Sequence, residues 1–232
     1  MLQLVISQVC RLVRQYRSGL GDQFSIPPDE LKALASLLAS LESRDLGLDQ
    51  LPIRSGGPGG LFSRTPVDPV SYMEVLDSSD FNASVFILKS PPCEIPLHDH
   101  PGMHGFLKPL LGRVQIHSYT LVPDCPAPLP ARVCCARPQP PLILGPHDPP
   151  CILWPQQGNI HRVVAMDKSP AAFLDILIPR YSPPERDCSY FQEVRGHQCP
   201  LDPGHVLLKR IPCPRTYSCD SVPYKGPPVQ LT

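Results

Sequence analysis

Proline accounts for 33 of the 232 residues, and this content is the strongest constraint on the fold of the chain. The proline ring removes a backbone hydrogen-bond donor, so proline is confined to first helical turns, strand edges and turns. This argues against a mainly helical protein and favours short strands joined by many turns. Basic and acidic residues balance at 21 each, which leaves no excess of positive charge for binding nucleic acid or an anionic membrane surface.

The N-terminal part of the chain departs from this pattern. Apolar residues at helical spacing predict an amphipathic helix over residues 2–17. A second helix should begin near Pro27-Pro28-Asp29, because proline and an acidic residue both favour the first helical turn. Leucines between 31 and 41 then line one face of that helix. We expect both helices to pack against the main core, with binding to a partner as the alternative.

A Ser-Gly-Gly-Pro-Gly-Gly break at residues 55–60 predicts the domain organisation. Residues 1–55 form a helical segment, and residues 56–232 are expected to fold as a single structural unit. From residue 70 onward, short apolar runs alternate with Pro, Gly and Asp clusters, which is typical of an antiparallel sandwich or barrel. The predicted strands are Tyr72–Asp77, Ser84–Lys89, Gly112–Val122, Ile152–Trp154, Arg162–Ala165 and Ala172–Ile178.

Two further regions have a less regular pattern. Residues 125–150 are rich in Pro, Ala and Cys, and we expect exposed loops around one short strand at 142–144. Residues 206–211 are expected to form an edge strand in an otherwise loop-like tail.

The main chemical signal is a His-x-His pair in the run Pro96–Gly105. Side chains two apart on a strand point to the same face, so His98 and His100 should project together from a strand end. Two imidazoles on one face can hold a divalent metal ion. His104, in the turn that follows, is either a third ligand or a residue that supports the ligands. The competing interpretation is a pair of polar residues on a solvent-exposed face.

A second histidine segment lies at Trp154–Val164. Its Pro-x-x-Gly turn places His161 at the start of an apolar, β-branched run. A single histidine in this position is more often a core or surface residue than a ligand. Its significance comes from pairing with His98 and His100, because a barrel can bring sequence-distant strands together around one metal ion.

These two segments resemble the two motifs of the cupin superfamily. The first cupin motif carries a glutamate where this chain has His104, and the second motif has one residue fewer in its turn. The missing acid implies a three-histidine metal site, His98, His100 and His161, in place of a site that includes a carboxylate. The resemblance also implies a mainly β, cupin-type double-stranded β-helix barrel with N-terminal α-helices packed against it.

Within the cupins, the run Leu97–Gly105 with Lys108 is similar to the family of cysteamine (2-aminoethanethiol) dioxygenases and plant cysteine oxidases. The other matching segments are Gly158–His161, Ala171–Leu177, Arg186–Phe191 and Val222–Pro227. The resemblance covers most of the chain from about Gly56 and extends weakly to the helices. Departures lie in residues 125–150 and 196–215.

The resemblance implies an enzyme that uses Fe(2+) and adds both atoms of O₂ to a thiol sulfur, giving a sulfinic acid. The implied substrates are cysteamine, giving hypotaurine, and the N-terminal cysteine of proteins, giving Cys-sulfinate, with a role in oxygen-dependent N-degron turnover. We expect a monomer without nucleic-acid or membrane partners. The alternative function is a non-catalytic metal-binding cupin that acts as an interaction module. A zinc-dependent isomerase or hydrolase is disfavoured because the motif lacks a glutamate as general base.

Two residues near the end of the barrel sequence are candidates for substrate contact, together with His104. An acid within the apolar run Phe173–Ile178 is costly to bury unpaired. Asp175 therefore either faces the site, where it orients an amine or a histidine, or pairs with an arginine at a strand edge. Tyr181 lies just beyond this run.

Cys188 and Tyr190 are two residues apart and share a face if the chain is extended. Thiol dioxygenases can carry a Cys–Tyr thioether beside the iron, and the resemblance places this pair there, as catalytic residues with Asp175. The alternative is an ordinary buried thiol beside an unrelated aromatic ring. The chain has ten cysteines, no C-x-x-C pair and no recognised secretory signal or membrane span. We therefore expect reduced thiols in a cytoplasmic protein, with the nucleus as a second location.

Overall fold

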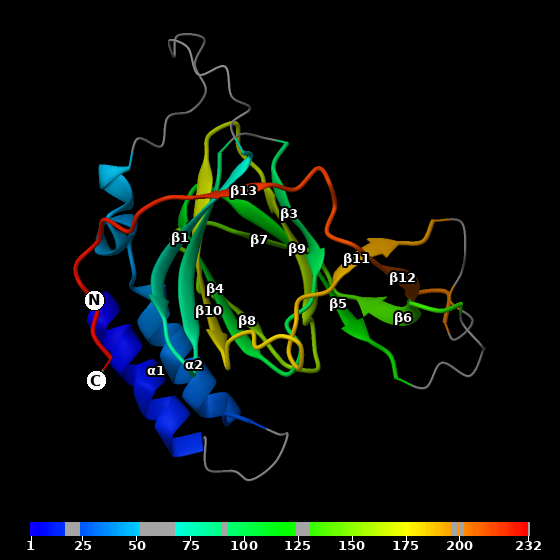
Figure 1. Cartoon of the computed structure of the whole chain (residues 1–232), viewed down its shortest axis with the longest axis horizontal. Coiled ribbons are helices and arrows are strands. Elements are labelled where there is room, and N and C mark those ends of the chain that lie inside the picture. Colours follow the sequence, from blue (N-terminus) through cyan, green and yellow to red (C-terminus); the bar gives the residue numbers. More distant parts are fainter. Residues whose placement is uncertain are drawn as a thin grey trace.

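The computed structural model describes residues 1–16, 24–51, 68–89, 92–123, 130–195, 199 and 202–231. Over these residues the protein is a β-barrel with two helices on its outside (Figure 1). The helices are α1 (Leu2–Tyr16) and α2 (Pro28–Ala39), followed by short 3-10 helices η1 (Ser43–Leu46) and η2 (Leu48–Gln50). The strands are β1 (Val70–Asp77), β2 (Asn82–Leu88), β3 (Glu94–His98), β4 (His104–Leu111), β5 (Val114–Leu121), β6 (Val133–Pro138), β7 (Leu142–Leu144), β8 (Cys151–Leu153), β9 (Ile160–Ala165), β10 (Ala171–Ile178), β11 (Tyr190–Glu193), β12 (Val206–Ile211) and β13 (Cys219–Ser221).

The strands form two sheets that face each other around the barrel interior (Figure 1). The first sheet has the order β13-β1-β2-β10-β4-β8, and the second has the order β6-β12-β11-β3-β9-β5-β7. An additional pairing of β6 with β5 closes six strands of the second sheet into a ring. The described strands pair in antiparallel orientation, except that β1 and β13 pair in parallel. The predicted mainly β barrel is confirmed.

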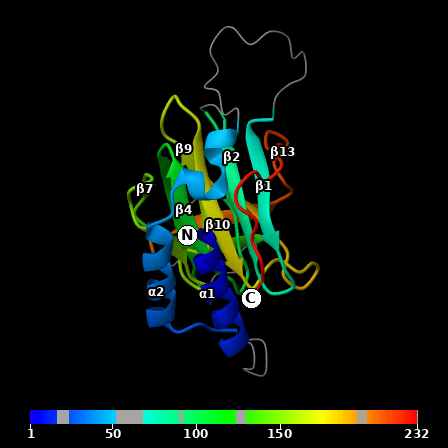
Figure 2. The ribbon, with the colours of Figure 1, turned by 90° about the vertical axis from the view of Figure 1, so that its left-hand side faces the viewer.

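Both N-terminal helices cover the outer face of the first sheet (Figure 2). Helix α1 buries one apolar stripe, and α2 begins with Pro28 and the acidic Asp29 and Glu30 in its first turn. Leucines of both helices share one core with outward-facing residues of β2 and β10. Burying each aliphatic side chain contributes about 1.5–3 kcal/mol, so the helices stabilise the barrel. The predicted packing of the helices against the barrel is confirmed.

Strand β10 shows how the first sheet positions the site. All eight of its residues are buried, because helices cover one face of the strand and the second sheet covers the other. Leu174 and Ile176 belong to the core that the helices share. Since side chains alternate along a strand, Phe173, Asp175 and Leu177 point into the barrel, where they line a cavity.

Strand β4 was not predicted from the sequence. His104 was expected in the turn after Pro101-Gly102, and the next strand was expected at Gly112, near the start of β5. Lys108 and Pro109, which lie within β4, are poor residues for a buried strand. In the structure the Lys108 ammonium donates hydrogen bonds to the carbonyls of Pro146 (2.6 Å) and Asp148 (2.8 Å), which compensates for its burial. Pro109 pairs with β10 beside a register shift, a place where proline is tolerated.

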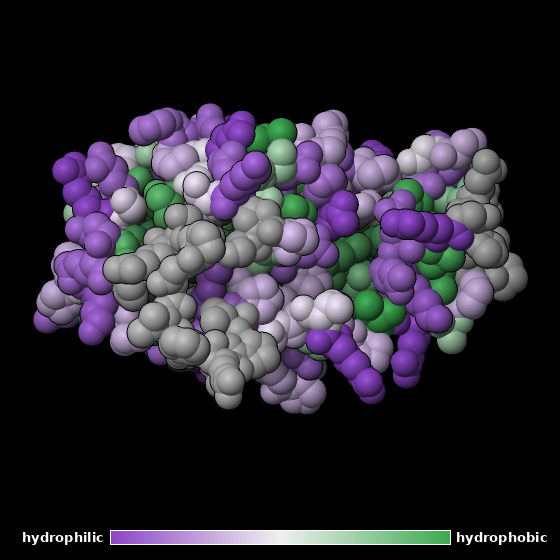
Figure 3. Space-filling model, turned by 90° about the horizontal axis from the view of Figure 1, so that it is seen from above, coloured by the Kyte–Doolittle hydropathy of each residue, from purple (hydrophilic) through white to green (hydrophobic). Residues whose placement is uncertain are grey.

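The region expected to be exposed loops also contains structure. Residues 133–138 form β6, in which Cys135 and Ala136 are buried. Strand β12 was expected at a sheet edge, but it lies between β6 and β11. Seen from above, the surface is mainly hydrophilic, and hydrophobic residues show among polar ones toward the end where these strands lie (Figure 3). Closure of the ring covers the apolar faces of these strands.

The predicted break at residues 55–60 lies outside the described residues, so the boundary at 55/56 stays a prediction. Within the described part of the chain, no helix has both the length and the apolar character needed to cross a membrane. In that part, Cys10, Cys134, Cys151, Cys188, Cys213 and Cys219 are free thiols, and Cys125 lies outside it.

Candidate metal centre

Three histidines meet inside the barrel. One ligand nitrogen from each of His98, His100 and His161 lies within 4.8 Å of the other two, and all three side chains are buried. Their ring centroids are 4.7–5.0 Å apart. His98 on β3 and His161 on β9 are directly opposite each other in the antiparallel pair, while His100 comes from the loop after β3.

His100 is positioned by a side chain that sequence reasoning did not single out. The Asn159 amide oxygen accepts a hydrogen bond from the His100 backbone N–H (2.8 Å). Its amide nitrogen donates to the carbonyls of His100 (2.8 Å) and Trp154 (3.1 Å). Asn159 therefore clamps the loop after β3 to the turn before β9, which carries His161. In the sequence, Asn159 stood out only by its place within the matching segment Gly158–His161, two residues before His161.

Hydrogen bonds to the outer nitrogens set the tautomers of two of the histidines. His98 Nδ1 lies 2.8 Å from the Pro96 carbonyl, which can only accept, so Nδ1 carries the proton. The Tyr181 hydroxyl donates to the Asp99 carbonyl (2.6 Å) and can accept from His100 Nδ1 (2.7 Å). In both rings the Nε2 lone pair is then free for a ligand bond.

The remaining polar atoms fit a bound metal ion. His100 Nε2 is buried and has no hydrogen-bond partner among the described residues. Burial lowers the pKa of His98, His100 and His161 below 6.5, and for His100 and His161 mutual repulsion with neighbouring rings adds to it. The imidazoles are therefore neutral near pH 7 and can act as ligands. A three-nitrogen set without a carboxylate suits a divalent transition metal.

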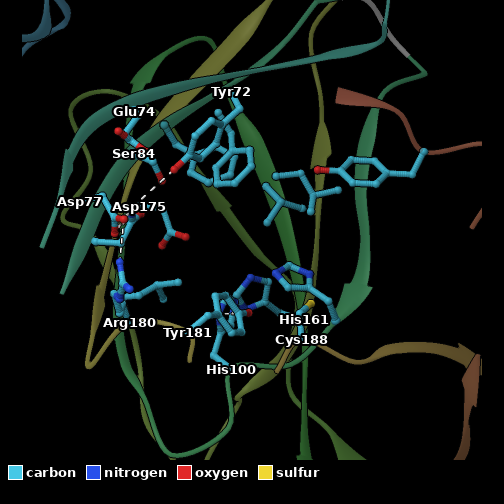
Figure 4. Close-up of a pocket in the computed structure, with 18 of the residues that line it drawn as sticks. Tyr72, Glu74, Asp77, Ser84, His100, His161, Asp175, Arg180, Tyr181 and Cys188 are labelled. Atoms are coloured by element: carbon cyan, nitrogen blue, oxygen red, sulfur yellow. Dashed lines mark hydrogen bonds and ion pairs between the residues drawn. The ribbon is translucent and has the colours of Figure 1, made fainter. Parts of the chain in front are cut away.

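A cavity of about 460 Å³ opens on the histidines, and most of the predicted site residues line it. Asp175 points into this cavity from the first sheet, across from His100, His161 and Tyr181 (Figure 4). The Asp175 side chain is 7% exposed, and no hydrogen bond or ion pair reaches it from the described residues. Burial raises the pKa of its carboxyl group to about 7. The nearby Arg180 pairs with Asp77 instead (2.6 Å).

Cys188 and Tyr190 also line the cavity. The segment that carries them is tied to the metal loop by Asp99: its carboxylate accepts from Ser189 N–H (2.7 Å), and its backbone N–H donates to the Ser189 carbonyl (3.1 Å). Burial raises the pKa of Cys188 to about 11 and raises that of Tyr190 as well. The thiol is free, and the Cys188–Tyr190 thioether stays a prediction.

His104 is not brought to this cavity. It lies on β4 and packs edge-on against Phe24 and Trp154, with ring centroids 6.2 and 6.1 Å away. Its Nε2 accepts a hydrogen bond from the Ile26 backbone N–H (3.3 Å). Burial lowers its pKa to about 4, so it is a neutral residue that joins the helical segment to the barrel.

Replacement of Tyr181 by phenylalanine tests the support of His100. The ring is kept, but the hydroxyl that bridges the Asp99 carbonyl and His100 Nδ1 is lost. Loss of such an outer partner typically costs 10–100-fold in metal affinity, and we expect a decrease of about this size in metal titrations. Tyr224→Phe is a matched control, because the Tyr224 hydroxyl also donates to a backbone carbonyl but lies outside the cavity. Equal affinities for the two variants would contradict this role.

Replacement of Asp175 by asparagine tests its burial through stability. The pKa of this carboxyl is about 7 in the folded protein against an ordinary 3.8, so the folded state binds more protons between these values. The contribution of Asp175 to the free energy of unfolding of the wild-type protein therefore decreases as the pH rises from about 4 to about 7. In urea unfolding of the metal-free protein, the free energy of unfolding of the variant should exceed that of wild type by about 1–4 kcal/mol between pH 4 and 7, and the difference should grow as the pH rises. A difference that does not change with pH would contradict the assignment.

Comparisons with known proteins show the family of the chain. The PCO_ADO family model matches residues 37–229. The chain is 34% identical to the 2-aminoethanethiol dioxygenase of Mus musculus over 263 residues, covering 99% of this chain and 96% of that protein. It is 34% identical to plant cysteine oxidase 1 of Arabidopsis thaliana over 170 residues, covering 71% of this chain and 55% of that protein. A Klebsiella pneumoniae structure with a double-stranded beta-helix domain aligns with a TM-score of 0.38 and 17% identity, over 57% of this chain and 96% of that one. The resemblance seen in the motifs is confirmed, and the chain belongs to the PCO_ADO family of thiol dioxygenases, with 2-aminoethanethiol dioxygenase and the plant cysteine oxidases.

Proposed function

We propose that the protein is an Fe(II)-dependent dioxygenase that adds both atoms of O₂ to the sulfur of an aminothiol or of an N-terminal cysteine. The product is a sulfinic acid. The observation that carries the proposal is the trio of buried, neutral histidines, which opens on the same cavity as the unpaired Asp175. Family membership favours iron among the metals that imidazole ligands can hold.

In this proposal His98, His100 and His161 hold the metal. When bound, Fe(II) supplies the site for O₂ activation and favours the thiolate form of the substrate. The chain contributes neutral ligands, so the metal keeps its full positive charge. Pro96 and Tyr181 hold the outer nitrogens of two of these rings and so keep their inner lone pairs directed toward the metal.

Asp175 is proposed to bind the substrate amine. Cysteamine and an N-terminal cysteine both present a thiol two carbons from an ammonium group. With the thiol at the histidines, the ammonium can pair with the Asp175 carboxylate, which the described residues leave without a partner. A buried charge that lacks a partner is costly, so binding of a cation to it is favourable. This pairing orients the sulfur before oxidation.

Cys188 and Tyr190 are proposed to form a thioether beside the metal. Both line the cavity, and the pair occupies the position that the family resemblance implies. Peptide mapping by mass spectrometry would detect the linked pair as a loss of two hydrogens from the combined peptides. We further propose that the protein acts as a monomer in the cytoplasm or the nucleus, where it couples oxygen to N-degron turnover.

Anaerobic loading with Fe(II), followed by O₂ and either cysteamine or a Cys-initiated peptide, tests the proposed function. We expect oxygen consumption and a product heavier by two oxygen atoms. Protein that holds stoichiometric iron yet forms no product with either thiol would contradict enzymatic function. The alternative, a metal-binding cupin that serves as an interaction module, would then be favoured.

A further inference from the structure

A polar row crosses the inner face of the first sheet. Glu74 on β1 is directly opposite Ser84 on β2, and Ser84 is directly opposite Asp175 on β10. Residues that face each other across antiparallel strands project from the same side of the sheet. All three line the metal cavity, and they follow one another along one of its walls (Figure 4).

An aromatic row lies beside this polar row. Two residues further along each strand, Tyr72, Phe86 and Phe173 are paired in the same register. Their rings are in contact, with centroids 5.5 and 5.6 Å apart. This flank offers little charge to a ligand, so the electrostatic character of the wall depends on the polar row.

Within the described part of the chain, no cation or donor compensates the two carboxylates of the row. No hydrogen bond or ion pair reaches Glu74 from the residues that the structure describes, and the same holds for Asp175. The other acid at the mouth, Asp77, pairs with Arg180 at 2.6 Å, so these two charges cancel. Asp175 is buried deep in the cavity, whereas Glu74 is exposed where the cavity meets solvent.

The cavity has room for more than a small aminothiol. Cysteamine has four heavy atoms, and a water molecule occupies only about 30 Å³ in the liquid. A cavity of about 460 Å³ therefore leaves space beyond the thiol and amine. Neighbouring strands are about 4.8 Å apart, which places Glu74 about 10 Å from Asp175 across two strand spacings. A second peptide residue lies one Cα step of about 3.8 Å beyond the first, and a long side chain can span the remainder.

We propose that Glu74 selects substrates by the residue that follows the N-terminal cysteine. Lysine or arginine at this second position can pair with Glu74, while the amine of the first residue occupies Asp175. Aspartate or glutamate there meets the like charge of Glu74, because Arg180, which also lines the cavity, is paired with Asp77. This inference rests on the proposed function and specifies its peptide substrate class.

The expected size of the effect follows from the exposure of Glu74. An exposed ion pair changes an equilibrium by about two- to fivefold, and repulsion of a like charge is of similar size. Between lysine and glutamate at the second position we therefore expect about a tenfold difference in kcat/KM. The difference should shrink as salt is raised, because exposed charges are screened.

Three peptides that differ only in a Lys, Gln or Glu second residue test the proposal on the iron-loaded protein. For wild type we expect kcat/KM to be highest for the Lys peptide, intermediate for the Gln peptide and lowest for the Glu peptide. Glu74→Gln should reduce the Lys-to-Glu ratio to near one, and Glu74→Lys should invert it. Glu94→Gln is the matched control, because Glu94 is also an exposed glutamate on a strand but lies outside this cavity, and it should keep the wild-type ratio.

The outcomes separate this inference from the function on which it rests. Turnover of the Gln peptide with no Lys-to-Glu preference, or a preference that Glu74→Gln leaves intact, would overturn the role of Glu74 alone. A failure to oxidise any of the peptides or cysteamine would contradict the proposed function and the inference with it.

Discussion

Replacing His161 with alanine is expected to remove the bound iron and to abolish thiol oxidation. In the wild-type protein, three histidine nitrogens that lie within 4.8 Å of one another can bind the metal ion. The change removes one of these three ligands. Loss of an outer hydrogen-bond partner already costs 10–100-fold in metal affinity, so loss of a ligand should cost at least about 100-fold. Iron content after desalting and the rate of oxygen consumption with cysteamine measure the two effects.

The control for this variant is His147→Ala, because His147 is exposed and lies outside the cavity. It should keep stoichiometric iron and full activity. Circular dichroism should show a folded barrel for both proteins. A His161→Ala protein with normal activity would mean that the ligand set is wrong.

Replacing Asp175 with asparagine is expected to lower kcat/KM for aminothiols strongly. Removing one partner of a buried charge pair costs about 2–5 kcal/mol, which corresponds to a decrease of about 30- to 4,000-fold. Asparagine keeps the size of the side chain but cannot neutralise an ammonium group. Because burial raises the pKa of this carboxyl to about 7, wild-type kcat/KM should fall as the pH drops through 7 and the carboxylate is protonated. The variant should lack this dependence.

A thiol without an amine distinguishes amine binding from other roles of Asp175. 2-Mercaptoethanol carries a hydroxyl in place of the ammonium, so it should be a poor substrate for wild type and should lose little further activity in the variant. Equal losses with both thiols would show that Asp175 acts on the metal site instead. Iron content should match wild type, since Asp175 is not among the three metal ligands.

Much of the fold could be predicted because local chemistry decides it. Proline disfavours a mainly helical chain, and short apolar runs between Pro, Gly and Asp clusters indicated the strands that became β1, β2, β5, β9 and β10. The strand β4 escaped prediction because Lys108 is unfavourable in a buried strand unless partners exist. Those partners are the carbonyls of Pro146 and Asp148, nearly forty residues away, and no local pattern reveals them.

The candidate site divides in the same way. Sequence spacing paired His98 with His100, because two histidines two positions apart are a specific chemical signal within a short motif. The resemblance to the cupin motifs added His161 and implied the three-histidine set. The same reasoning assigned His104 to the substrate, although the structure places it against Phe24 and Trp154, away from the cavity. A residue only a few positions from the ligands can face the opposite direction once the chain has turned.

By itself, the proline-rich pattern of short apolar runs and turns determined an antiparallel sandwich or barrel, and the His-x-His pair indicated a metal-binding group, since both depend on residues close together in the chain. Only the tertiary structure decided that Asn159 clamps the His100 loop and that Asp175 faces the metal cavity without a partner. It also decided that Glu74, Ser84 and Asp175 form one row, because strand register joins positions up to a hundred residues apart. Register arises from the packing of whole sheets and helices, and a linear pattern does not contain that information.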